Sequence, residues 1–116
     1  MKIAYIAHPV SGDVLGNIIK IIAIVRNVNL MEPEIVPFVP YLADLYALDD
    51  DTPEERERGI KNDTHILKSG LVDELRVYGD RITSGIHHEI LLAQEVGMNI
   101  RIMNRNLDAE FVEKYL

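Results

Sequence analysis

The sequence predicts a single α/β domain with a mostly parallel sheet of four to five strands and helices on both faces. Short apolar runs alternate with longer amphipathic segments along residues 1–116, which is the order of elements in a parallel sheet. The chain is 47% hydrophobic, enough for one core of ordinary size. We find no linker, repeat or low-complexity tract, so we expect no second domain.

The first predicted strand is Lys2 to Ala7, a short apolar run typical of a buried strand. The turn-rich segment His8 to Asp13 follows it, and the Asp13 side chain is a suitable N-cap for a helix. That helix is predicted over Val14 to Met31.

Apolar side chains almost surround the Val14 to Met31 helix, where Lys20 and Arg26 are the only charged residues. These two charges and three asparagines argue against a membrane span. A helix that is apolar on more than one face needs cover from its own sheet and from something else. We therefore predict a homodimer or higher homo-oligomer through this helix, with a small core helix as the alternative.

The middle of the chain predicts a second strand and a second long helix. Glu34 to Val39 is a strand candidate, and Pro37 within it favours an edge position. Tyr41 to Asp51 is ambiguous between a short helix and a loop. Thr52 begins a strong helix signal, with a proline and two glutamates directly after it, and the helix is predicted to reach Lys68.

The last part of the chain predicts two further strands that flank a helix. The strands are Glu74 to Tyr78 and Asn99 to Met103, and the helix between them runs within Thr83 to Gly97. Phe111 to Leu116 is predicted as a short closing helix that Asp108 introduces.

Glu89 is the most informative residue, because it falls on the apolar side of its helix. At about 100° per residue it falls near the centre of one apolar face, which is expected to be buried and is formed by Ile86, Ile90, Leu92, Ala93 and Val96. A buried carboxylate costs several kcal/mol unless it is protonated, hydrogen-bonded or paired. This favours a functional role, and the alternative is a structural glutamate tied to a buried arginine or a backbone amide.

Three loops are predicted at the carboxyl ends of the parallel strands, where open sheets of this type bind ligands. They are His8 to Asp13, the region after Val39, and Gly79 to Gly85. The last loop leads into a helix N-terminus with free amides and two hydroxyls, which suits an anion such as phosphate. His8 stands where these loops converge, with a solvated turn histidine as the alternative role.

Composition excludes several classes of function. With a net charge of −7 and scattered basic residues, the chain is not expected to bind nucleic acid. There is no cysteine, which excludes disulfides and thiolate zinc sites and fits a cytoplasmic location. Residues at the N-terminus do not resemble a signal peptide. His87 and His88 point about 100° apart and have no third ligand at helical spacing, so no metal is expected. The chain also has no glycine-rich dinucleotide fingerprint, and no cofactor is expected.

Three stretches of this sequence resemble the nucleoside 2-deoxyribosyltransferase superfamily, and in particular its short bacterial and phage proteins. They are Ile3 to Pro9, Val72 to Asp80 and Thr83 to Ala93. The resemblance implies a flavodoxin-like or Rossmann-like sheet, assembly into oligomers, and action on the N-glycosidic bond of a nucleoside or nucleoside monophosphate.

The resemblance also implies roles for individual residues. Glu89 matches the family's nucleophile, which attacks the anomeric carbon and forms a glycosyl-enzyme ester. Tyr5 matches the tyrosine that orients this nucleophile, and Asp63 is the nearest candidate for the aspartate that contacts sugar or base. Family transferases often carry aspartate where this chain has Thr83, whereas the nucleotide hydrolases tend to have serine. Thr83 therefore favours a phosphorylated ligand or hydrolysis.

The sequence thus predicts an enzyme that cleaves or exchanges an N-glycosidic bond, with Glu89, Tyr5 and Asp63 as catalytic residues. A nucleotide-binding module of the same fold without catalytic activity is the alternative. The candidate substrate-binding residues lie in the first and third loops: His8, Pro9, Asp80, Thr83, Ser84 and Gly85.

Overall fold

The computed structural model describes Met1–Leu116 and confirms a single α/β domain of the flavodoxin-like or Rossmann-like type. Its four strands are all parallel, in the order β2-β1-β3-β4. They are β1 (Lys2–Ala7), β2 (Ile35–Phe38), β3 (Glu74–Val77) and β4 (Asn99–Ile102). The expected bounds of β2, β3 and β4 were one or two residues too long.

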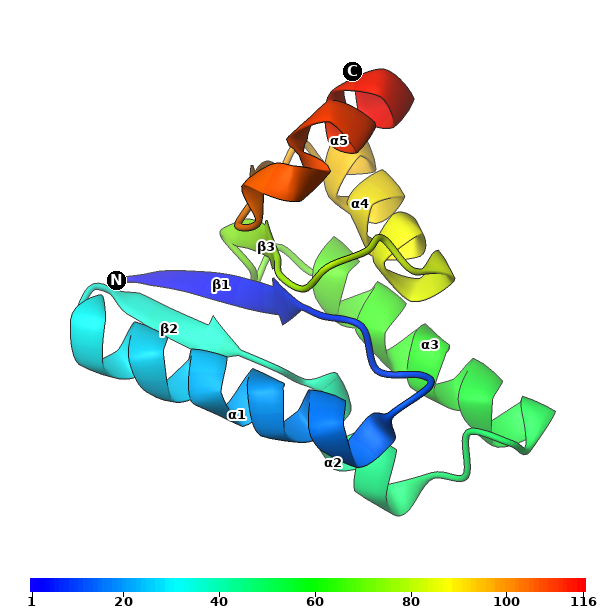
Figure 1. Cartoon of the computed structure of the whole chain (residues 1–116). Helices are drawn as coiled ribbons and strands as arrows, with labels where there is room; N and C mark the ends of the chain where they lie inside the picture. Colours follow the sequence, from blue (N-terminus) through cyan, green and yellow to red (C-terminus); the bar gives the residue numbers. More distant parts are fainter.

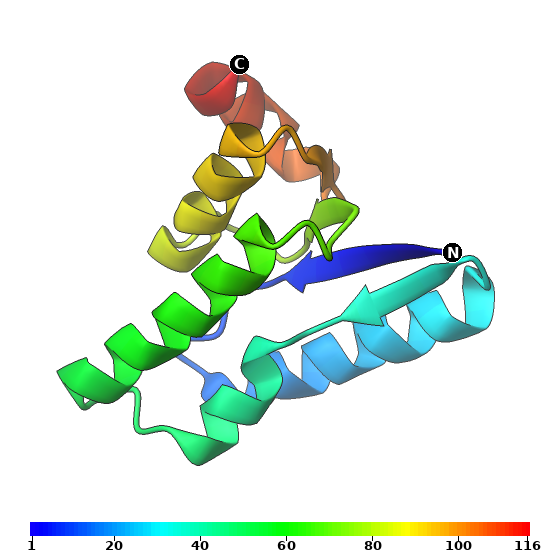
Figure 2. The same ribbon diagram turned by 180° about the vertical axis from the view of Figure 1, so that it is seen from behind.

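Helices lie on both sides of the sheet, as the sequence predicts (Figures 1 and 2). Helix α1 runs alongside β2 on one side, and α3 and α4 pack against each other on the other side. The helices are α1 (Val14–Met31), α2 (Tyr41–Ala47), α3 (Pro53–Lys68), α4 (Ser84–Glu95) and α5 (Asp108–Tyr115), with a short 3-10 helix at Arg105–Leu107 before α5.

Strand β1 lies at the centre of the sheet and is its most buried strand. From Ala4 to Ala7 its residues have no exposed surface. Tyr5 packs in the main apolar cluster with Leu75 of β3, and α4 contributes Ile86 and Ile90 to the same cluster. Burial on both faces explains why β1 is a continuous apolar run rather than an alternating one.

The edge position of β2 agrees with its proline. Pro37 pairs in register with Ala4 of β1, and the other side of β2 has no neighbouring strand. Proline has no amide hydrogen to donate to a neighbouring strand. An edge strand tolerates it because one side of that strand has no neighbour.

Helix α1 has the bounds that the sequence predicts. The Asp13 side chain caps it by accepting a hydrogen bond from the Gly16 amide at 3.1 Å. Only Asn17, Ile18, Ile21 and Val28 of this helix are buried, so most of its apolar residues face outward.

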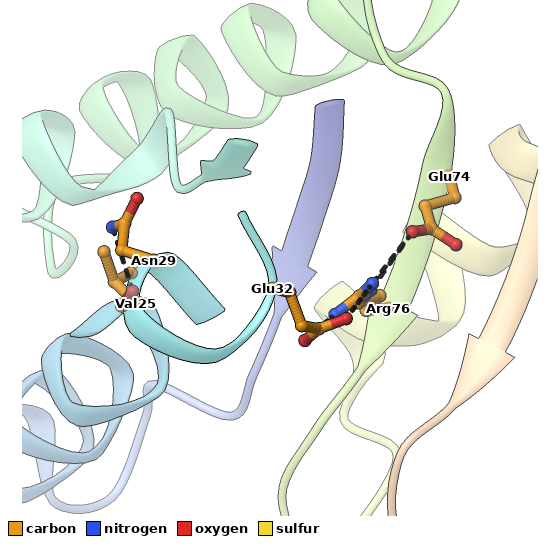
Figure 3. Close-up of polar contacts among 5 residues, drawn as sticks. All are labelled: Val25, Asn29, Glu32, Glu74 and Arg76. Carbon is orange, nitrogen blue, oxygen red and sulfur yellow. Dashed lines mark hydrogen bonds and ion pairs between the residues drawn. The ribbon is translucent and has the colours of Figure 1, made fainter. Parts of the chain in front are cut away.

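A partly buried ion cluster ties the end of α1 to β3 (Figure 3). The Arg76 side chain is 1% exposed and donates two hydrogen bonds to the Glu32 carboxylate, at 2.8 and 3.0 Å. It also pairs with buried Glu74 at 3.1 Å. The two-pronged contact matches the planar geometry of guanidinium and carboxylate, and it raises the pKa of Arg76 while lowering that of Glu32. Asn29, close by in the figure, donates to the Val25 carbonyl at 3.0 Å.

The order of strands places a topological switch point between β1 and β3. From β1 the chain moves outward to β2 and then returns to β3 on the other side of β1. The loops after β1 and β3 therefore separate and leave a crevice at the carboxyl edge of the sheet. Arg81 joins these loops by donating to the Ser11 carbonyl at 3.2 Å.

Candidate functional site

A pocket of about 430 Å³ opens at the carboxyl edge of the sheet. Its walls come from the loop after β1, from α2 and α3, and from the first turns of α4. Part of the wall is apolar and includes Leu45 of α2, Leu48 directly after α2, and Ile60 of α3. Pockets of this size and mixed lining hold small organic ligands.

Glu89 lies at the inner end of this pocket, and its environment opposes ionisation. Its side chain is half-buried and lines the cavity from the second turn of α4. Burial, and to a smaller extent the nearby Asp63 carboxyl, raise the pKa of Glu89 from 4.5 to about 8. Arg76 is the only buried arginine, and it pairs with Glu32 and Glu74. Glu89 is therefore not tied to a buried arginine, which was one of the structural alternatives for this residue.

Tyr5 lies behind Glu89 and is fully buried in β1. Its hydroxyl has no partner at hydrogen-bond distance in the structure, yet it is close enough to the Glu89 carboxyl to favour the ionised form. This effect lowers the pKa of Glu89 but is smaller than the effect of burial. Burial, followed by the Glu89 charge, raises the pKa of the Tyr5 phenol, so Tyr5 keeps its proton and can act as a donor to ionised Glu89.

Asp63 faces the same pocket from α3. Its Oδ1 atom is buried and has no hydrogen-bond partner. Burial, and then the charge of Asp44, raise the pKa of Asp63 from 3.8 to about 7. A buried acceptor without a hydrogen-bond partner lowers the stability of the folded state. A ligand that donates a hydrogen bond to this atom would remove that penalty.

The Asp63 carboxyl raises the pKa of Glu89, and no nearby cation opposes this effect. No lysine or arginine is among the groups that shift the pKa of Glu89 or of Asp63. The pKa values of both carboxyls therefore lie near neutral pH, about 7 for Asp63 and about 8 for Glu89. Paired carboxyls in this state can supply both an acid and a nucleophile or base.

The N-terminus of α4 forms one side of the pocket. Thr83 caps the helix by accepting a hydrogen bond from the Ile86 amide at 3.2 Å. The amides of Ser84 and Gly85 make no hydrogen bond within the protein, and both residues line the pocket. Free amides at the positive end of a helix can bind a hydroxyl or an anionic group.

The remaining sequence candidates lie in different places. His8 is buried and lines the pocket, and it also borders a second cavity of about 300 Å³ beside α1. Pro9 lies outside the pocket, packed so closely on Gly79 that a side chain at that glycine would clash with its ring. Asp80 borders the second cavity and pairs with Arg81 at 3.1 Å. The pocket thus brings together Glu89, Asp63, His8, Thr83, Ser84 and Gly85, with Tyr5 behind Glu89.

Two residues of α2 that sequence reasoning missed complete the inner wall. The Tyr41 hydroxyl donates to the Ile6 carbonyl at 2.6 Å and so anchors α2 to β1. Asp44 lines the pocket, accepts a hydrogen bond from Asn62 at 3.3 Å and acts on Asp63 through its charge. Both lie in the stretch that was ambiguous between helix and loop, so no periodic signal indicated which side chains face inward.

Glu89 should lower the free energy of unfolding by an amount that depends on pH. Between pH 4.5 and about 8 the folded state holds a proton on Glu89 that the unfolded state has lost, so stability falls as pH rises. We expect Glu89→Gln to leave the free energy of unfolding nearly unchanged at pH 4.5 and to raise it by roughly 3 kcal/mol at pH 8. Urea unfolding followed by circular dichroism at both pH values measures this. Equal effects at the two pH values would contradict the raised pKa.

Comparison with known proteins gives a family but no activity. No curated protein matches the chain. One family model, described as a domain of unknown function (DUF7768), matches residues 2–103 and so covers all four strands and the pocket. The chain therefore belongs to the DUF7768 family, whose function is not assigned.

Proposed function

We propose that this protein cleaves or exchanges the N-glycosidic bond of a nucleoside, deoxynucleoside or nucleoside monophosphate. The observation that carries the proposal is that Glu89 and Asp63 line one pocket of about 430 Å³ and that no lysine or arginine lowers the pKa of either carboxyl. Departure of a base leaves positive charge on the anomeric carbon. An uncompensated pair of carboxyls stabilises that charge.

In the proposed reaction, the Glu89 carboxylate attacks the anomeric carbon and forms an ester while the bond to the base nitrogen breaks. Asp63 gives its proton to the departing base. Water, or the nitrogen of a second base, then attacks the same carbon, and the Asp63 carboxylate accepts the proton that this nucleophile loses. The ester bond breaks and Glu89 is again a carboxylate. Attack by water gives hydrolysis, and attack by a base gives transfer.

The neighbouring groups support these roles. Tyr5 lowers the pKa of Glu89 and so favours its ionised form, which is what an orienting residue should do. The free amides of Ser84 and Gly85 are placed to hold a sugar hydroxyl or a 5′-phosphate. A helix holds Glu89 more rigidly than a loop would, which suits an attack that needs close alignment.

A screen for free base tests the proposal. The protein is incubated with a panel of nucleosides, deoxynucleosides and their monophosphates, with and without an acceptor base, and the products are identified by mass spectrometry. We expect free base, or an exchanged nucleoside, from at least one member of the panel. Absence of turnover across the panel would contradict the proposal.

The pH dependence of turnover gives a second prediction. The active form has Glu89 ionised and Asp63 protonated, which is the minor arrangement of the single proton in the empty pocket because the pKa of Asp63, about 7, lies below that of Glu89, about 8. Its abundance follows that of the one-proton state as a whole, which is greatest between about pH 7 and 8. We expect kcat/KM to be bell-shaped with its maximum in that interval. Asp63→Asn removes a charge that raises the pKa of Glu89, so the acidic limb should move to lower pH and the alkaline limb should disappear. A flat profile in the unmodified protein would count against the paired mechanism.

A nucleotide-binding module without catalytic activity is the second candidate, and one observation favours it. With a pKa of about 8, Glu89 is mostly protonated at neutral pH in the empty pocket, and a protonated carboxyl is a hydrogen-bond donor rather than a nucleophile. This candidate predicts a rise in melting temperature with a nucleoside or nucleotide that is recovered unchanged.

A further inference from the structure

The outward face of α1 carries large apolar side chains with no cover in the folded chain. Leu15 and Ile19 are each 70% exposed, Leu30 is 63% exposed and Ile22 is 49% exposed. At 100° per residue these four side chains and that of Arg26 fall within a narrow arc, directed away from the buried side of the helix. We call this set, together with exposed Ala23, the α1 stripe.

The exposed apolar surface of the stripe is on the order of 500 Å², and a contiguous patch of that size is often an interaction surface. Its charge suggests which occupant. The chain has a net charge of −7, yet α1 has no acidic residue. Two copies can therefore bring this helix together without apposing the carboxylates that cover the rest of the molecule.

The residues of the α1 stripe are spaced so that two antiparallel copies of the helix bring stripe residues opposite stripe residues. A two-fold axis between Ile22 and Ala23 places Leu15 of one copy opposite Leu30 of the other and Ile19 opposite Arg26. Ile22 then meets Ala23, whose small side chain allows a close approach of the helices. Arg26 can cover Ile19 with its aliphatic stem while its guanidinium group reaches water. A symmetric dimer requires this kind of self-complementary surface.

We propose that the protein forms a homodimer in which the α1 helices of two copies pack antiparallel along the α1 stripe, about a two-fold axis between Ile22 and Ala23. This dimer is independent of the reaction proposed for the pocket. The occupant is a second copy of this chain, rather than an unrelated protein or a membrane.

The mass of the full chain in solution is the first test. Sedimentation velocity at micromolar concentration should give the mass of a dimer. We expect Ile22→Glu to shift the equilibrium to monomer at least tenfold, because it places two carboxylates at the centre of the apolar contact. Asn27→Glu is the matched control: it adds the same charge to an exposed position of the same helix outside the α1 stripe and should leave the dimer intact.

Cross-linking tests whether the two α1 helices are antiparallel. The chain has no native cysteine, so only the introduced cysteines can react. With a short bis-maleimide reagent, Ile22→Cys and the double variant Leu15→Cys/Leu30→Cys should give covalent dimers, whereas Leu15→Cys alone should not. Circular dichroism confirms that each variant is folded.

Three results would overturn the proposal. They are a monomeric mass for the unmodified chain, cross-linking of Leu15→Cys alone, and a monomer that floats with phospholipid vesicles. The last is a real alternative, since α1 is long and apolar enough to cross a membrane by length and composition, with a mean hydropathy of 1.5 and 22% of it buried.

Discussion

Glu89→Gln is expected to reduce release of free base by about a thousandfold or more, while the protein stays folded. The amide keeps the shape of the side chain but cannot form the ester with the anomeric carbon. The same substitution should also stabilise the protein at pH 8. A variant that is more stable and inactive would separate a catalytic role from a structural one. The measurement is base release per unit time under saturating nucleoside.

Glu95→Gln is the matched control for this experiment. Glu95 ends the same helix, is exposed, and makes one ion pair with Lys68 at 3.8 Å, so its loss should leave turnover unchanged. Intact-protein mass spectrometry of a quenched reaction should detect one added sugar in the active protein and none in Glu89→Gln. Base release that persists in purified Glu89→Gln would rule out the proposed mechanism.

Arg76→Ala is expected to lower the free energy of unfolding by about 3–5 kcal/mol. The substitution leaves buried Glu74 without its partner and removes the two-pronged contact to Glu32 that ties α1 to β3. This loss is a large fraction of the stability of an ordinary domain. Urea unfolding at neutral pH measures it.

Two further variants test the physical reason for this loss. Glu32→Gln should cost less, because the Glu32 side chain is 39% exposed and water can replace part of its contact. The double variant Arg76→Met/Glu74→Leu should recover much of the loss, since it removes both buried charges instead of orphaning one. If the double variant is as unstable as Arg76→Ala, the loss comes from packing and not from the unpaired carboxylate.

Local chemistry predicted the regular elements well. The Val14–Met31 helix has its expected bounds because Asp13 caps it and Pro33 follows its end. The helix after Thr52 begins and ends as expected, although the Thr52 hydroxyl donates to Asp49 at 3.0 Å instead of capping the helix. Val96 was wrongly expected to be buried, because the helix ends one residue earlier and Gly97, with a φ of +71°, turns the chain away from the helical path.

Long-range partners could not be predicted from local patterns. Arg76 bonds to Glu32 across 44 residues of sequence, and nothing in either segment indicates the other. For the pocket, the apolar side of α4 identified Glu89, but the contribution of Asp44 depends on how α2 docks on β1 through Tyr41. The placement of such residues is decided by packing between elements.

The central position of β1 has a consequence for how the chain folds. The Ile3 amide donates to the Asp73 side chain at 2.7 Å across 70 residues of sequence, and β1 pairs with β3 directly after that point. Closing such a long loop costs entropy before any contact repays it, so folding should be slow compared with that of a helical bundle of equal length. During synthesis, β1, α1 and β2 can form a unit first, with one side of β1 left open until β3 emerges from the ribosome. The pocket is thus one of the last features of the molecule to form.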